Sequence, residues 1–145
     1  MKNVTTPLAI LFGLAGGHVM ADESSNPLVN ERWHTRPLIV VAPDARDQTL
    51  RDFQQTLLMP ANREAFVERE MVLYTVVDGV GKRNGQTLDA HTTQALLTSL
   101  GVDGKGPTRL LLVGKDGGTK IDQLAPLDAR QIFATIDRMP MRQTN

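Results

Sequence analysis

The stretch GKGPTRLLLVGKDGG, residues 104–118, determines how the fold of this chain is interpreted. A loop rich in glycine and containing one proline leads into Arg109–Val113, a short apolar run typical of a buried strand. Asp116-Gly117-Gly118 follows. Asp-Gly and Gly-Gly dipeptides readily adopt the positive φ angles that hairpin turns require. Thr119–Leu124 then alternates polar and apolar residues, as a half-exposed strand does. The stretch therefore predicts a β-hairpin whose first strand is buried.

Two apolar runs upstream predict further strands of the same sheet. Residues 38–42 (LIVVA) lie between Pro37 and Pro43 and include β-branched side chains. A short unbroken run of this kind favours a strand buried on both faces. Residues 71–77 (MVLYTVV) have the composition of a second strand.

Helices are expected between these strands. Asp44 stands at the N-cap position of the first helix, which Pro60 should end. Residues 62–70 are expected to add a further helical turn before the second strand. Residues 78–85 (DGVGKRNG) hold three glycines and predict a loop, and residues 88–100 predict another helix.

The last helix has the clearest signals at its ends. Asp128 is expected to cap it, and Gln131 stands three residues later, where it would reach back to the cap. Leu127 and Ile132 are spaced as a hydrophobic staple, and Pro140 should end the helix.

The resulting order is strand, helix, strand, helix, strand, strand, helix (βαβαββα). Two β-α-β steps imply parallel pairing, and the final hairpin adds an antiparallel edge. These elements predict one α/β domain, a three-layer sandwich with a mixed sheet over residues 33–142, followed by a tail at 143–145. No internal repeat divides the chain.

The N-terminus has the layout of a secretory signal peptide. Lys2 supplies a positive charge near the N-terminus, and residues 7–17 are apolar. Val19 and Ala21 then place side chains of small or moderate size at the minus-three and minus-one positions before Asp22. A membrane anchor is the alternative, but the apolar run is shorter than the roughly 20 residues that span a bilayer. We therefore expect residues 1–21 to be cleaved off, residues 22–32 to form a flexible leader, and the protein to be periplasmic or secreted with no remaining membrane span.

Composition excludes several classes of function. The chain of 145 residues has 16 basic and 16 acidic side chains, and it lacks the cationic face that nucleic-acid binding needs. It has no cysteine, which excludes dithiol exchange, thiolate peroxidase chemistry, cysteine nucleophiles and thiolate metal sites. Gly79-Val80-Gly81-Lys82-Arg83 does not have the spacing of a phosphate-binding loop.

Three motifs carry a resemblance to known proteins: Arg36-Pro37-Leu38, residues 112–118 (LVGKDGG) and residues 136–142 (IDRMPMR). With the element order, they resemble the bacterial family called domain of unknown function 4174 over residues 33–142. The resemblance implies a thioredoxin-like fold and a relation to a module of extracellular matrix proteins such as equarin. It implies no established activity, because fold does not determine function.

The resemblance also indicates where a functional surface would lie. Thioredoxins carry their cysteines just after the first strand, a region that here contains Pro43, Asp44 and Arg46. The loop before the third strand, with Pro107 and then Arg109, resembles the thioredoxin cis-proline segment. The Pro107 peptide bond is left open between cis and trans. Asp44 and Arg46 would either hold an anion or partner carboxylate at the helix N-terminus, or Asp44 would simply cap it.

No catalytic, cofactor or metal site is predicted. His34 and His91 lie on different elements, and neither has a serine placed for a hydrolytic triad: Ser99 is within a helix and residues 24–25 are in the leader. The leading hypothesis is a non-redox binding module whose partner is a protein, a peptide or another envelope component. The alternatives are a cysteine-independent enzyme using Asp44, Arg46 or Arg109, and a purely structural protein of the cell envelope.

Overall fold

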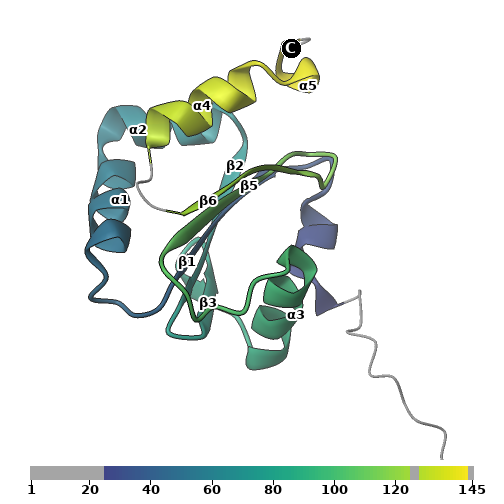
Figure 1. Cartoon of the computed structure of the whole chain (residues 1–145). Helices are drawn as coiled ribbons and strands as arrows, with labels where there is room; N and C mark the ends of the chain where they lie inside the picture. Colours follow the sequence, from purple (N-terminus) through teal and green to yellow (C-terminus); the bar gives the residue numbers. More distant parts are fainter. Residues whose placement is uncertain (1–24, 125–127, 144–145) are drawn as a thin grey trace, which may run out of the picture.

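The computed structural model describes residues 25–124 and 128–143. The predicted signal segment with its Ala21-Asp22 bond, Leu127 of the predicted staple, and the last two residues lie outside these ranges. Figure 1 shows a central sheet with helices on both faces. Within the described residues no helix is long and apolar enough to cross a membrane.

The sheet has six strands in the order β4-β3-β2-β1-β5-β6. The fold is therefore α/β with a mixed sheet, as predicted. The strands are β1 (Arg36–Ala42), β2 (Met71–Val77), β3 (Val80–Arg83), β4 (Gln86–Thr87), β5 (Arg109–Val113) and β6 (Thr119–Leu124). The helices are the 3-10 helix η2 (Pro27–Glu31), α1 (Gln48–Leu58), α2 (Pro60–Glu68), α3 (Ala90–Leu100), α4 (Ala129–Asp137) and α5 (Pro140–Gln143).

Strand β1 is the centre of the sheet, and all seven of its residues are buried. It pairs in parallel with β2, placing Ile39 opposite Tyr74, as the first β-α-β step predicts. The second step was predicted wrongly: β5 runs antiparallel to β1, with Leu111 opposite Ile39. The connection from β2 to β5 passes through two additional strands before α3, so it is not a simple β-α-β crossover.

Those two strands correct the predicted loop at residues 78–85. Asp78 and Gly79 turn the chain with positive φ angles of 50° and 75°, and β3 then pairs antiparallel with β2. Asn84 and Gly85 make the next turn into β4. Three glycines in eight residues indicated turns correctly, but they hid the short strand between the turns.

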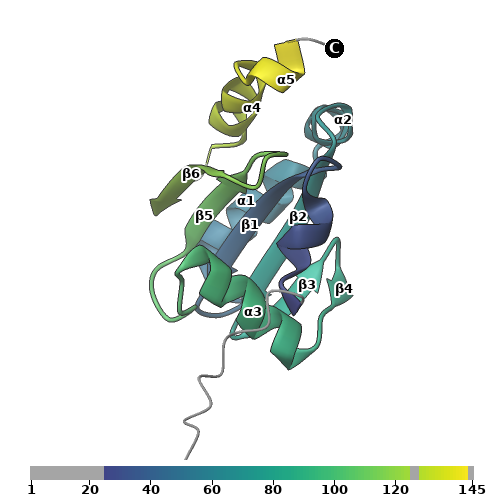
Figure 2. The ribbon, with the colours of Figure 1, turned by 90° about the vertical axis from the view of Figure 1, so that its right-hand side faces the viewer.

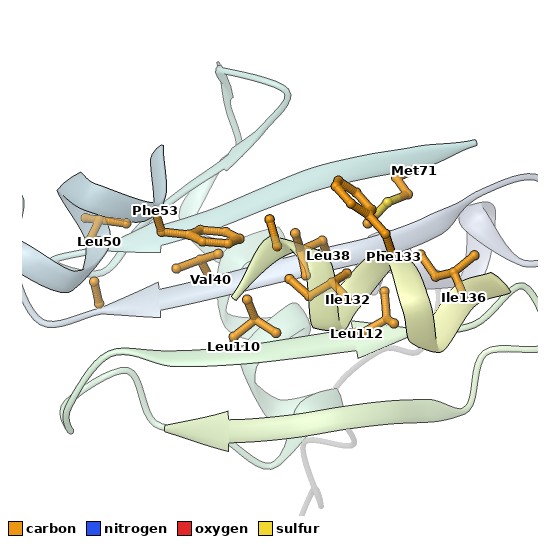
Figure 3. Close-up of a cluster of buried hydrophobic side chains, with 12 residues drawn as sticks. Leu38, Val40, Leu50, Phe53, Met71, Leu110, Leu112, Ile132, Phe133 and Ile136 are labelled. Atoms are coloured by element: carbon orange, nitrogen blue, oxygen red, sulfur yellow. The ribbon is translucent and has the colours of Figure 1, made fainter. Parts of the chain in front are cut away.

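One hydrophobic core fills the space between the sheet and helices α1 and α4. Figure 3 shows Ile132 of α4 beside Leu38 and Leu112 of the sheet, and Phe133 of the same helix beside Met71. The buried side chains of α1 in this core are Leu50 and Phe53. Asp128 caps α4 by accepting from the Arg130 N–H at 2.9 Å, as predicted, whereas the Gln131 side chain turns to Gln123.

A second core lies on the opposite face of the sheet, under α3 (Figure 2). Leu96 and Leu97 of α3 pack there with Ile39, Tyr74 and Leu111. Asp89 caps α3, and Gly101 ends it in the left-handed conformation at φ 68°. Successive side chains of β1 therefore enter two different cores, which explains its unbroken apolar sequence.

The predicted flexible leader is partly ordered. Pro27–Glu31 forms a 3-10 helix, and its first turn is closed by the Asn26 side chain, which accepts from the Leu28 N–H at 3.1 Å. Leu28 packs against the core under α3, and Glu31 is only 5 % exposed. The folded domain thus begins at least six residues before the predicted boundary at Trp33.

Candidate functional site

The region after β1, where the sequence placed a functional surface, is an exposed turn leading into α1. Pro43, Asp44 and Arg46 are exposed in this turn. Asp44 does not cap α1 as predicted, because its Oδ1 accepts from the Arg46 N–H at 2.7 Å and closes the turn. The cap is Asp47, whose Oδ1 accepts from the Leu50 N–H at 2.9 Å.

Asp47 also joins this turn to the loop before β5. Its Oδ1 accepts from the Thr108 hydroxyl at 2.6 Å, and Thr108 is buried directly after exposed Pro107. The Thr108 hydroxyl first, and then the Leu50 N–H, lower the pKa of Asp47. The two loops in which the resemblance indicated a functional surface therefore meet through a hydrogen bond, although neither Asp47 nor Thr108 was predicted to have a role.

Four of the five predicted surface residues are exposed in these two loops: Pro43, Asp44, Arg46 and Pro107. Arg109 is different. Its Nε and Nη2 donate to Asp122 of β6 at 2.6 and 2.7 Å, and this pair lowers the pKa of Asp122. Arg109 is thus bound within the sheet, while Arg46 is exposed in the turn.

The histidines are placed partly as predicted. His34 is exposed, but the Nε2 atom of His91 lies 2.9 Å from the Ser25 Oγ of the expected leader. No sequence pattern indicated this contact, which joins residues 66 positions apart. Both histidines are exposed, and among the described residues no group of three potential metal ligands occurs.

Sequence reasoning also missed a buried polar network around Glu31. Its Oε1 accepts from the Tyr74 hydroxyl at 2.8 Å and from Arg83 Nε at 2.6 Å, and its Oε2 accepts from the Thr35 hydroxyl at 2.5 Å. Burial alone would raise the pKa of Glu31, but these three donors outweigh it, and the pKa is lowered overall. Burial, together with the bond to Glu31, raises the pKa of Tyr74. The network fastens η2 to β2 and β3.

A second polar group lies where β1 begins. Figure 1 shows the β5–β6 turn and the start of β1 at the same end of the sheet, toward α4 and α5. Here Arg36 is buried, Lys115 pairs with Glu70, and Arg142 pairs with Glu68 at 2.5 Å. Arg36, Lys115 and Arg142 come from the three separate motifs on which the family resemblance rests. The motifs therefore meet in one part of the fold, away from the turn before α1.

These features define a cysteine-free α/β domain in which the loops before α1 and before β5 form a joined surface. The chain belongs to the family described as a domain of unknown function (DUF4174), whose model matches residues 27–145. The match begins at the first residue of η2. No curated protein and no solved structure matches the chain.

We expect Asp47→Ala to destabilise the protein by about 1–2 kcal/mol, because it removes a helix cap and the partner of the buried Thr108 hydroxyl. Thr108→Val should couple to it by about 1 kcal/mol in a double-mutant cycle measured by urea unfolding. Asp128→Ala removes a cap that has no bond to Thr108 and is the matched control. Additive effects of Asp47→Ala and Thr108→Val would contradict the joined loops.

Proposed function

We propose that this protein is an exported, non-redox, thioredoxin-like module that binds a protein or peptide of the cell envelope. The binding surface is formed by Pro43, Asp44, Arg46 and Pro107. The observation that carries the proposal is the hydrogen bond between Thr108 and Asp47, which holds two exposed loops against each other. A surface fixed in this way loses little conformational entropy when a partner binds.

The topology supports the thioredoxin-like part of the proposal. The strand order β2-β1-β5-β6, with β1 parallel to β2 and antiparallel to β5, joins one β-α-β unit to one β-β-α unit. Helices α1 and α4 cover one face and α3 the other. The β3–β4 hairpin and helices α2 and α5 are additions to this arrangement.

The absence of cysteine supports a binding role over thiol redox chemistry. The sequence contains no cysteine, and a carboxylate, Asp47, stands at the N-terminus of α1 and binds the helix N–H of Leu50. An anion would have to compete with this side chain for the helix terminus. The exposed Arg46 is then the positive charge of this surface that a partner's carboxylate could meet.

Export predicts a specific processed N-terminus. When the full chain is expressed in a bacterium with a periplasm, we expect the mature protein in the periplasmic or extracellular fraction, beginning at Asp22. N-terminal sequencing of the purified protein checks this. Replacing Ala21 with a bulky residue should block cleavage at that bond. A cytoplasmic protein that retains Met1 would contradict export.

The binding surface predicts a charge-dependent partner. We expect Arg46→Glu to lose the envelope protein or peptide that the mature wild-type protein captures, because the side chain would then repel a carboxylate. Arg51→Glu changes the same charge on the exposed side of α1 and should keep the partner. Quantitative mass spectrometry of captured material compares the two. Equal recovery by both variants would place the interaction elsewhere, and no recovery by the wild type would count against the module.

A further inference from the structure

Arg36 is a buried cation whose hydrogen-bonding capacity is only partly used. Arg36 is only 1 % exposed, and its Nη1 donates to the backbone carbonyl of Arg69, directly after α2, at 2.8 Å. Among the described residues, Nε and Nη2 have no hydrogen-bond partner. An unpaired charged donor inside a protein is costly, since its interactions with water are lost.

The two free nitrogens belong to a single edge of the guanidinium group. The Nε–H and Nη2–H bonds along this edge point in parallel, which is the geometry that grips two oxygens of one anion. Two other arginines of this protein use the same edge for that purpose. Arg69 binds Asp137 through Nε and Nη2, both at 2.9 Å, and Arg109 binds Asp122 likewise.

The charges near Arg36 leave its own charge unbalanced. Glu70 and Arg142 act on it with opposite signs. Glu70 is already paired with Lys115, and Arg142 with Glu68. The backbone carbonyl of Arg69 supplies only a partial negative charge, at the C-terminal end of α2. A further negative group would therefore be stabilised at the free edge.

The surrounding backbone is also strained in a way that local sequence does not explain. Trp33 and Glu70 have φ angles of 66° and 51°, which are unfavourable for residues with bulky side chains. Both are held by the same end of the sheet: the Trp33 N–H donates to the Lys115 carbonyl at 2.7 Å, and the Glu70 carbonyl accepts from the Arg36 N–H at 2.9 Å. Such strain tends to be kept at functional sites.

We propose that the free edge of Arg36 is a binding site for a small oxyanion, of the class of a carboxylate or inorganic phosphate. This site is independent of the surface formed by the loops before α1 and β5. The anion would enter by displacing the neighbouring ion pairs, whose acidic partners Glu70 and Glu68 have side chains 54 % and 64 % exposed. The basic partners Lys115 and Arg142 are only 14 % and 22 % exposed, so opening each pair moves the exposed carboxylate into water and leaves the cation in place.

The single tryptophan of the chain, Trp33, is three residues from Arg36 and provides the readout. The mature protein is titrated with sodium acetate and, separately, sodium phosphate, against sodium chloride at matched ionic strength. We expect a saturable change in Trp33 fluorescence and a rise in Tm with at least one of the two oxyanions and not with chloride. A saturable response to acetate alone selects a carboxylate site, and a response to phosphate alone selects a phosphate site.

Arg36→Lys keeps the charge but removes the two-pronged edge, so affinity should fall at least about tenfold. Arg109→Lys changes an edge already occupied by Asp122 and should leave affinity within about twofold. If Arg36→Lys does not fold, the ¹H–¹⁵N signal of Arg36 Nε in the wild type should still shift with the oxyanion. The proposal is overturned by a response no larger than that to chloride, by unchanged affinity in folded Arg36→Lys, or by an Nε signal that does not move because enclosed water alone occupies the edge.

Discussion

Replacing Glu31 with alanine should lower the free energy of unfolding by about 3 kcal/mol, which corresponds to a fall in Tm of about 10 °C. Glu31 is 5 % exposed and accepts hydrogen bonds from Tyr74, Arg83 and Thr35. Its removal leaves the hydroxyl of fully buried Tyr74 without its acceptor. The loss of Glu31 costs less at Arg83, because the Arg83 side chain is 42 % exposed and can be hydrated by water instead.

The Glu31 prediction is tested by urea unfolding of the purified protein with two companion variants. Tyr74→Phe removes one donor and should cost about 1 kcal/mol. Glu68→Ala removes an exposed carboxylate from its pair with Arg142 and should cost less than about 1 kcal/mol. If Glu31→Ala is no more destabilising than Glu68→Ala, then residues 27–31 are the flexible leader that the sequence suggested.

The same carboxylate should contribute to acid sensitivity. The pKa of Glu31 is lower in the folded protein than its ordinary value of 4.5, so the unfolded chain binds more protons across that interval. The stabilisation by Glu31 is fully present above this value and is lost as pH falls through the folded pKa. Stability measured against pH should therefore decline less steeply in Glu31→Gln than in the wild type. Parallel curves would mean that Glu31 has no lowered pKa.

Gly81→Ala should destabilise the protein by about 2–3 kcal/mol, although alanine normally favours a strand more than glycine does. Gly81 lies in β3, where α3 packs closely against the strand. A Cβ atom added there would collide with the Thr93 Oγ1 and lie 2.9 Å from the Cγ2 atom of the same side chain. Either α3 or β3 must move to make room.

Thr93→Ala should partly rescue Gly81→Ala, because it deletes both of the colliding atoms. The remaining Thr93 Cβ would still be 3.1 Å away, so we expect the cost of Gly81→Ala to fall by about 1–2 kcal/mol on this background and not to disappear. Gly106→Ala is the matched control, since an added Cβ there meets nothing within 4 Å. Thermal unfolding of the wild type, the two single variants and the double variant measures the coupling between Gly81 and Thr93. Equal costs of Gly81→Ala with and without Thr93 would show that the two elements do not pack as described.

The elements predicted best from sequence are those whose signals are local. The bounds of β2, β5 and β6 agree with the predicted ranges. Asp128 was assigned correctly as a cap because a capping side chain bonds to its own helix. Near α1 the same rule chose Asp44 over Asp47, since both are aspartates before an apolar periodic segment. What distinguishes them is the Thr108 hydroxyl, 61 residues further along the chain.

The features that could not be predicted depend on contacts between residues far apart in the sequence. Glu31 was placed in a flexible leader because its neighbours are polar, but its partners Tyr74 and Arg83 are 43 and 52 residues away. The direction of β5 was wrong for a similar reason. A glycine-rich segment concealed β3, whose reversal of the chain removes the simple crossover that would have made β5 parallel. The local amino-acid composition predicts whether a residue is buried or exposed only where its sequence neighbours also surround it in the fold.

The two candidate sites differ in the kind of ligand they suit. The surface of Pro43, Asp44, Arg46 and Pro107 is exposed, and the hydrogen bond between Thr108 and Asp47 joins its two loops, which suits a macromolecular partner. The free edge of Arg36 is enclosed and binds through two parallel donors, which suits a small anion. Because the two sites depend on different residues, Arg46→Glu and Arg36→Lys separate their effects.

Site-specific photocrosslinking in the cell tests most directly whether the joined loops bind an envelope partner. A photoreactive residue is placed at position 46 or 107, and as controls at position 51 and at position 130, where the Arg130 side chain is 92 % exposed. We predict that positions 46 and 107 crosslink to the same envelope protein or peptide, and that positions 51 and 130 do not. Crosslinks of equal yield from all four positions, or from the controls alone, would contradict the proposed binding surface.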